Sequence, residues 1–284
     1  MMIIVDTYED FKPFKARILE AEIEERIKLW LKYMSNYPEL LKLQVECYQN
    51  DWMKYAYRVL SKVHLYLEEV EEAWNKLHKV SRKAYQRFSN FLNTEVDVVF
   101  VFYVGIGCGA GWATQYENKY AVLLGLENIV EEGWTSEEDL LGLIFHELGH
   151  IAHMFLRNIS PKAFEELESN PLFLLYSEGF AMRIEHLLLG KEKWRIASHP
   201  EWLKWCKENM AFLAKEYLKR AKRGEPVNEF YGSWLNIKGY SQTGYYLGHE
   251  FIKELEKELT LKEIAKLPLK TIEGKALKFL STIY

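Results

Sequence analysis

Residues 136–155 read SEEDLLGLIFHELGHIAHMF. Apolar residues occupy nearly every face of this segment, which predicts a helix buried in a protein core. Ser136 followed by Asp139 resembles a capping box at the start of that helix. Burying a polar group without partners costs on the order of 2–7 kcal/mol, so we expect a ligand that satisfies the polar side chains of the segment together. These side chains are His146, Glu147, His150 and His153.

The spacing of His146 and His150 predicts a metal site. Residues four apart lie one helical turn from each other, so both imidazoles project from one face and can bind the same ion. Glu147, beside the first histidine, can accept a proton from a water bound to the metal. We expect one zinc ion per chain, because zinc accepts imidazole and carboxylate ligands and three protein ligands leave a position open. The competing interpretation, core histidines bonded to backbone carbonyls, explains one histidine better than four buried polar groups.

The third ligand has to come from another segment. Glu178, at the start of a second apolar helical stretch that runs to Leu189, would complete a set of two histidines and one glutamate. Alternatively, Glu178 is a glutamate favoured by the dipole at a helix N-terminus. Other histidines remain possible ligands: His186, His199, His249 and, less easily because it continues the same helix, His153.

The chain resembles the gluzincin metallopeptidases, and within them the single-domain bacterial and archaeal family of predicted zinc-dependent proteases. That family pairs an HExxH helix with a Glu-Gly-(Leu)-Ala helix and a later Gly-Tyr-rich segment, which here are residues 146–150, 178–181 and 244–249. A weaker resemblance, carried by residues 146–153, is to the thimet-oligopeptidase and oligoendopeptidase group, whose members are much longer. The resemblance covers residues from about 94 to 258.

The resemblance implies a zinc-dependent oligopeptidase or endopeptidase that acts on a peptide or protein. In this interpretation zinc is held by His146, His150 and Glu178, and Glu147 is the general base. The developing oxyanion needs a further donor, and the resemblance favours a tyrosine. The candidates for this donor are Tyr240, Tyr245 and His249, and Glu117 is a candidate for holding the free amine of an exopeptidase substrate.

One position departs from the thermolysin-like pattern. Where those members carry an aspartate that supports a zinc histidine, this chain has Met182, so another group such as Glu185 would have to orient the ligand. Two alternatives to a peptidase remain open. One is a non-catalytic zinc protein that binds peptide without cleaving it, and the other is a zinc hydrolase of a non-peptide amide.

We expect an α+β fold that is mostly helical. A chain of 284 residues, 49% hydrophobic, can bury a sizeable core. Residues 1–93 read as helices packed on the core, and residues 94–284 as a zincin-like catalytic core. In that core, 94–157 would hold a small β-sheet and the active-site helix, and 158–284 a helical lobe.

Two β-branched and aromatic runs, residues 96–104 and 120–126, predict strands of that sheet. Between them lie the glycines of residues 105–111, which we interpret as a flexible hairpin loop beside the active site. No phosphate-binding helix follows these glycines, which argues against a nucleotide site.

Composition bounds the partners and the compartment. The net charge of −4, with basic residues dispersed among acidic ones, gives no reason to expect nucleic acid. No apolar run approaches the about 18 residues of a membrane span, and the N-terminus lacks the features of a signal peptide. Three scattered cysteines, Cys47, Cys108 and Cys206, suit a reducing cytosol and make a poor disulfide framework. We therefore expect a cytoplasmic protein and leave its oligomeric state open.

Overall fold

The computed structural model describes residues 1–197 and 199–283, apart from the side chain of Gln49. The chain forms two compact units, Met1–Glu147 and Leu148–Tyr284, and the boundary lies inside helix α8 (Glu137–Arg157). Residues 1–93 share the first unit with the sheet. The fold is mostly helical with one small sheet, which confirms the predicted α+β class.

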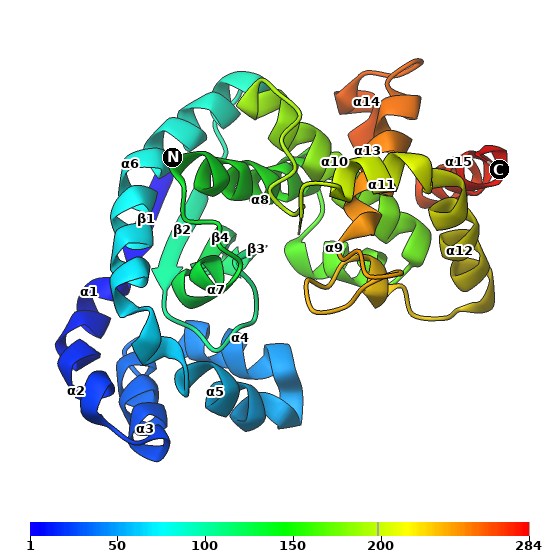
Figure 1. Cartoon of the computed structure of the whole chain (residues 1–284). Coiled ribbons are helices and arrows are strands. Elements are labelled where there is room, and N and C mark those ends of the chain that lie inside the picture. The colour runs from blue at the N-terminus through cyan, green and yellow to red at the C-terminus, as the bar shows by residue number, and fades with distance from the viewer. Residues whose placement is uncertain (198, 284) are drawn as a thin grey trace. The chain divides into compact units, whose positions relative to one another are not determined.

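The first unit holds the four strands and the N-terminal helices (Figure 1). The two predicted strands are confirmed as β2 and β4. The elements are β1 (Met2–Asp6), α1 (Tyr8–Phe11), η1 (Lys12–Phe14), α2 (Lys15–Glu20), α3 (Ile23–Met34), α4 (Pro38–Tyr48), η2 (Gln49–Asp51), α5 (Trp52–Leu60), η3 (Val63–Leu65), α6 (Leu67–Leu92), β2 (Val98–Tyr103), β3 (Gly111–Tyr116), β4 (Lys119–Gly125) and α7 (Leu126–Glu131).

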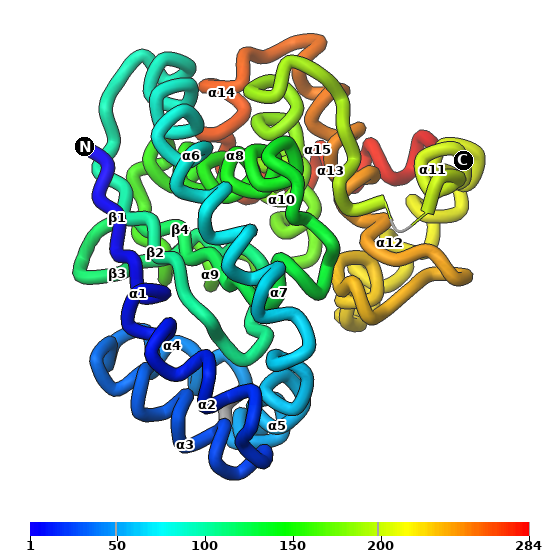
Figure 2. Tube along the Cα trace, turned by 60° about the vertical axis from the view of Figure 1, so that its left-hand side comes forward, coloured from blue at the N-terminus to red at the C-terminus, as the bar shows by residue number. Residues whose placement is uncertain are grey.

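The sheet is mixed, with the strand order β1-β2-β4-β3. Strands β1, β2 and β4 run parallel, and β3 pairs antiparallel with β4 at the edge. Every residue of β2 is buried, as expected for an inner strand covered on both faces. Helix α6 lies along one face of the sheet (Figure 1 and Figure 2). Trp74 and His78 on this helix both hydrogen-bond Asp6 of β1, at 3.0 and 2.8 Å.

The interpretation of residues 105–111 as a flexible hairpin loop is wrong. Strands β2 and β4 are parallel, so no hairpin can join them, and the glycines lead into β3 instead. The buried carboxylate of Glu127 accepts the backbone N–H groups of Gly105 and Gly107 at 2.7 and 3.0 Å. Burial raises the pKa of Glu127 to about 7. The segment is therefore an anchored connection, and the glycines let the backbone close around the carboxylate.

The second unit is helical in its described part. Its elements are α9 (Pro161–Glu168), α10 (Pro171–Leu189), α11 (Trp202–Glu208), α12 (Met210–Arg223), η4 (Asn228–Phe230), α13 (Thr243–Leu255), α14 (Leu261–Ala265) and α15 (Leu269–Thr282). Helices α10 and α13 meet with their backbones in contact. A Cβ atom on Gly179 would lie 2.2 Å from the carbonyl oxygen of Gly248, and one on Gly248 would lie 2.5 Å from that of Leu175.

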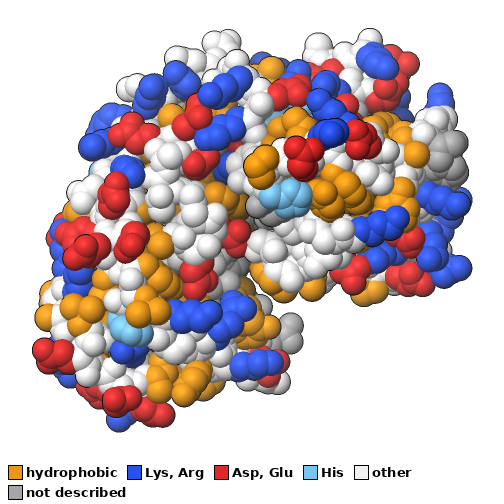
Figure 3. Space-filling view, viewed as in Figure 1, with side chains coloured by type: hydrophobic (Ala, Val, Ile, Leu, Met, Phe, Trp, Pro, Cys, Tyr) orange, Lys and Arg blue, Asp and Glu red, His pale blue; other side chains and the backbone are white. Residues whose placement is uncertain are grey.

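Among the described residues, no helix combines the length and apolar character needed to cross a bilayer. On the face shown in Figure 3, basic and acidic side chains are interspersed, in keeping with the net charge of −4.

The contact between α10 and α13 makes a stability prediction. We expect Gly248→Ala to destabilise the protein by about 1–3 kcal/mol, because the added methyl group meets backbone that cannot move aside. The matched control is Gly274→Ala in α15, where an added Cβ meets no atom within 4 Å. This control should be neutral or stabilising by about 0.5–1 kcal/mol. Urea unfolding with a chelator present measures both, and equal effects of the two substitutions would refute the packing argument.

Candidate metal centre

Helix α8 carries the HExxH motif and starts where the sequence predicts. Ser136 precedes the helix, and its hydroxyl oxygen accepts the N–H of Asp139 at 3.1 Å. The helix is buried as expected, with His146, Glu147 and His150 only 4, 7 and 8% exposed. An unpartnered imidazole or carboxylate is costly at such burial, so the motif is placed where a bound ion would stabilise it.

A close helix contact brings a carboxylate to His150. A Cβ atom on Gly149 would lie 2.9 Å from the Cα atom of Ala181 in α10. Glycine beside His150 therefore lets α10 approach the backbone of α8. Glu178 lies one turn before Ala181 on α10, and its Oε2 atom is 3.4 Å from Nε2 of His150.

His146, His150 and Glu178 form one group that could hold a metal ion. Their ligand atoms all lie within 4.8 Å of one another. Metal–ligand bonds of about 2.1 Å at tetrahedral angles separate ligand atoms by about 3.4 Å, which is the separation between His150 and Glu178. Among the described residues this is the single group of three or more such side chains. Helix α10 begins at Pro171, so Glu178 lies two turns inside it and a helix dipole does not account for its place.

The other histidines considered as third ligands lie outside this group. His153 is fully buried among aromatic rings, including those of Phe164 and Phe180 at 5.0 and 4.6 Å. Neither of its ring nitrogens has a hydrogen-bond partner among the described residues, and burial lowers the pKa of His153 well below its usual value. The ring is therefore neutral and packs as a core aromatic group.

His186 and His249 form a hydrogen bond with each other. Nε2 of His186 donates to the carbonyl of Lys193 at 3.0 Å, so its Nδ1 atom accepts from Nε2 of His249, also at 3.0 Å. The Nδ1 atom of His249 faces Glu250 at 3.1 Å. His249 has no exposed surface, so in this arrangement it does not reach a substrate. The pair holds α10 against α13.

A carboxylate absent from the sequence analysis lies beside His150. Glu168, at the end of α9, places its Oε1 atom 4.0 Å from Nδ1 of His150. The hydroxyl of Ser177 donates to the same oxygen at 2.7 Å, which fixes the carboxylate in place. Metal-binding histidines commonly donate their second ring N–H to a carboxylate, which sets the tautomer and orientation of the ring. A separation of 4.0 Å is longer than a hydrogen bond, so Glu168 can act on His150 through its charge.

Position 182, where the thermolysin-like pattern has an aspartate, is apolar in this chain. Met182 is completely buried. Glu185, the residue suggested in its place, is also buried and faces Arg195, with an Oε1–Nε distance of 3.5 Å. This buried ion pair gives Glu185 a structural partner, and Glu168 takes the place beside the ligand histidine.

Among the tyrosines, a pair lies near Glu178. The hydroxyl of Tyr231 donates to that of Tyr217 at 2.9 Å, and Tyr217 donates to the carbonyl of Pro171 at 2.7 Å. Burial, and then the charges of neighbours that include Glu178, raise the pKa of Tyr231 well above its usual value. The ring of Tyr245 contacts that of Tyr231 edge-on, with centroids 5.4 Å apart. Tyr245 therefore belongs to a cluster next to the ligand helix.

Tyr240 has a different environment. Its ring stacks on Trp205, with centroids 4.1 Å apart and planes 7° from parallel, and contacts the ring of His199 at 4.5 Å. The stacked indole of Trp205 covers one face of the Tyr240 ring. Tyr240 therefore packs against Trp205 and His199, apart from the cluster of Tyr231 and Tyr245.

The general-base candidate Glu147 packs against the edge strand. A Cβ atom on Gly111, the first residue of β3, would lie 2.6 Å from Oε1 of Glu147. Glycine at position 111 is thus required by the close approach of this carboxylate. The strand residues that follow, Trp112 to Thr114, are half-buried.

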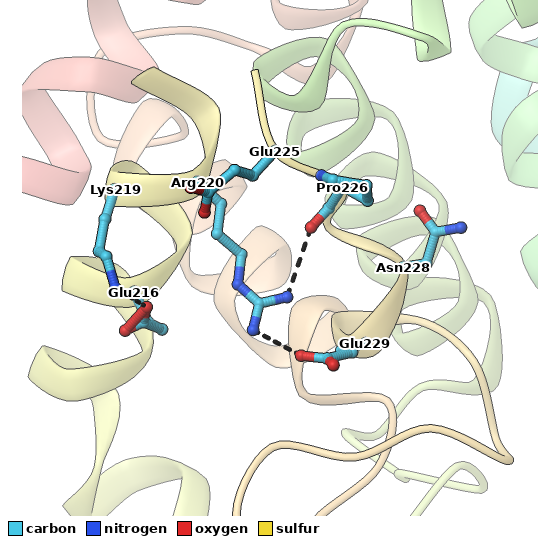
Figure 4. Close-up of a pocket in the computed structure, with 7 residues that line it drawn as sticks. All are labelled: Glu216, Lys219, Arg220, Glu225, Pro226, Asn228 and Glu229. Atoms are coloured by element: carbon cyan, nitrogen blue, oxygen red, sulfur yellow. Dashed lines mark hydrogen bonds and ion pairs between the residues drawn. The ribbon is translucent and has the colours of Figure 1, made fainter. Parts of the chain in front are cut away.

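A separate pocket of about 390 Å³ lies between α12 and η4 (Figure 4). Its charged residues pair with one another, Arg220 with Glu229 and Lys219 with Glu216. None of the three metal-site residues lines it, so it has no part in the candidate centre.

Glu168 and Tyr231 are not predicted from the sequence. Glu168 lies in the run Glu165-Glu166-Leu167-Glu168, where nothing distinguishes one glutamate from another. The one available signal is its position directly before Ser169 and Asn170, the residues that lead into the ligand helix. Tyr231 lies in a connection without periodicity, and only the folded chain shows what it contacts.

The centre predicts how substitutions change metal affinity. Glu178→Ala removes a ligand and should abolish tight binding. Glu168→Gln keeps the shape but removes the charge beside His150, and should weaken binding about 10- to 100-fold. The control is Glu165→Gln, an exposed residue of the same helix. Competition with a chromogenic chelator measures all three, and equal affinities of the two glutamine variants would exclude a role for Glu168.

No protein-family model matches the chain, and no curated protein and no solved structure matches it either. The resemblance to gluzincins therefore rests on the residues of the motifs alone.

Proposed function

We propose that the protein is a zinc-dependent peptidase of the oligopeptidase or endopeptidase type. The observation that carries the proposal is the convergence of His146, His150 and Glu178, with Glu147 on the same helical turn. A structural zinc site usually closes with four protein ligands, whereas a catalytic site has three. The described residues offer three, which favours a catalytic centre over a structural one.

The chemistry follows from the residues around the centre. A zinc ion held by these ligands supplies Lewis acidity, polarising a carbonyl oxygen and making water more acidic. The carboxylate of Glu147 is not part of the ligand group, so it is available to accept the proton of the attacking water and pass it to the leaving amine. Tyr245 is the proposed donor to the oxygen on which negative charge develops.

The position of the edge strand supports a peptide as the substrate. Strand β3 pairs with β4 on one side only, and an edge strand can bind an extended peptide through its backbone. Gly111 packs against Glu147 at the start of β3. A peptide that adds to this edge would run past the general base.

An endopeptidase or oligopeptidase fits better than an exopeptidase. Glu117, considered as the group that holds a free amine, lies exposed in the turn after β3. Glu117 lies six positions after Gly111, which corresponds to about 20 Å at the usual rise of a strand. Glu117 is therefore too far from Glu147 to hold the amine of a residue next to the scissile bond.

Replacement of the general base tests the mechanism. We expect Glu147→Gln to retain the metal and to reduce peptide cleavage about 10²- to 10⁴-fold, because the amide cannot accept the proton of water. Glu137→Gln, at the exposed start of the same helix, is the control and should keep full activity. Metal content and cleavage of a quenched fluorescent peptide library are measured on the same samples.

Each outcome of this comparison has a meaning. Undiminished cleavage by Glu147→Gln would refute the mechanism. Tightly bound zinc with no cleavage of any peptide by the wild type would refute the peptidase and favour a peptide-binding protein. Chelator-sensitive hydrolysis of small amides alone would move the substrate class to a non-peptide amide.

The contact between Gly111 and Glu147 gives a second test. Gly111→Ala should displace the Glu147 side chain, since the new methyl group would overlap Oε1. We expect at least a tenfold lower kcat, a loss of about 1.4 kcal/mol of transition-state stabilisation, with unchanged metal content. Gly274→Ala serves again as the control. An unchanged kcat in Gly111→Ala would show that the position of Glu147 relative to β3 does not matter for turnover.

A further inference from the structure

Two of the three cysteines meet in the first unit. Cys108 lies in the anchored connection between β2 and β3, and Cys47 lies in the last turn of α4. They are far apart in the sequence, and only the fold brings them together. No local sequence pattern therefore marks them as a pair.

The connection is docked on one face of α4. The side-chain oxygen of Gln44 accepts the N–H of Ile106 at 3.3 Å, and its backbone carbonyl lies 3.5 Å from Sγ of Cys108. The hydroxyl of Tyr48 donates to the carbonyl of Gly107. Positions 44, 47 and 48 share one helix face because they are three and four residues apart. Cys47 therefore lies between the two residues that hold the connection.

The two thiols differ in exposure and in acidity. Cys47 is exposed, whereas Cys108 is half-buried. A side-chain hydrogen bond with Cys108 lowers the pKa of Cys47. The same hydrogen bond, and then burial, raise the pKa of Cys108. An accessible sulfur of lowered pKa next to a second thiol is the arrangement of redox-sensitive cysteine pairs.

We propose that Cys47 and Cys108 form a reversible dithiol–disulfide site that reacts with low-molecular-weight disulfides. The Cys47 thiolate attacks such a disulfide, one thiolate of the reagent leaves, and a mixed disulfide forms on Cys47. Cys108 then loses its proton and attacks the Cys47 sulfur, which releases the second thiolate. The protein loses two electrons and two protons, and the reagent is reduced to two thiols.

The cross-link would have consequences for the fold. It ties α4 to the connection that leads into β3, three residues before Gly111. It also closes a long loop of the chain, which restricts the unfolded state and raises the unfolding temperature. The site is independent of the proposed peptidase activity, because its chemistry needs neither metal nor substrate.

Thiol chemistry on the full chain tests the site. The reduced protein is titrated with mixtures of oxidised and reduced glutathione, alkylated, and analysed by intact mass and peptide mapping. We expect the wild type to lose the mass of two hydrogen atoms and to yield one linked peptide pair containing Cys47 and Cys108. Cys108→Ser should instead accumulate glutathione on Cys47, since the second attack is lost. Cys47→Ser should form neither product.

Cys206→Ser is the matched control. Cys206 is completely buried, and burial raises its pKa to about 12, so it should react only after unfolding. This variant should form the disulfide as the wild type does, with the same rise in unfolding temperature. Three alkylatable thiols in the wild type at excess oxidised glutathione, or no glutathione on Cys47 in Cys108→Ser, would overturn the proposal.

Discussion

One apolar helix buries several polar side chains, and the helices around it have to supply partners for them. Helix α8 places His146, Glu147 and His150 where little water reaches them. Their burial is tolerable only with partners that are themselves fixed. Glu178 on α10 and Glu168 on α9 are such partners for His150. Both come from the two helices that follow α8 directly in the chain, so neighbouring elements supply the residues of the centre.

Glycines allow the close approaches that build this centre. Gly149 lets α10 reach the backbone of α8, and Gly179 with Gly248 lets α13 reach α10. Gly111 lets the edge strand reach Glu147. Each is a place where a methyl group would meet an atom closer than 3.0 Å. A side-chain hydrogen bond between His186 and His249 also links α10 to α13.

Local sequence pattern predicted the elements but not their pairing. The helix at 137–157 and the strands near 98 and 120 carry strong periodicity and clear ends, so their prediction is confirmed. Strand β1 was missed because its five residues gain their stability from β2, a partner far along the chain. His146 and His150 could be predicted because HExxH is a local motif, and Glu178 because it lies in a second apolar helical stretch and completes a known ligand set. Glu168 and the pairing of Cys47 with Cys108 depend on tertiary contacts that no local pattern encodes.

We propose that two imidazoles and one carboxylate hold a metal beside Glu147, with one coordination position left open for water. X-ray absorption spectroscopy of the zinc-loaded protein tests it most directly, because it counts and distinguishes the ligands. We expect four nitrogen or oxygen ligands at about 2.0–2.1 Å, two of them imidazoles, one the carboxylate of Glu178 and one exchangeable with solvent. A third imidazole, a sulfur ligand, or a site closed by four protein ligands would contradict it.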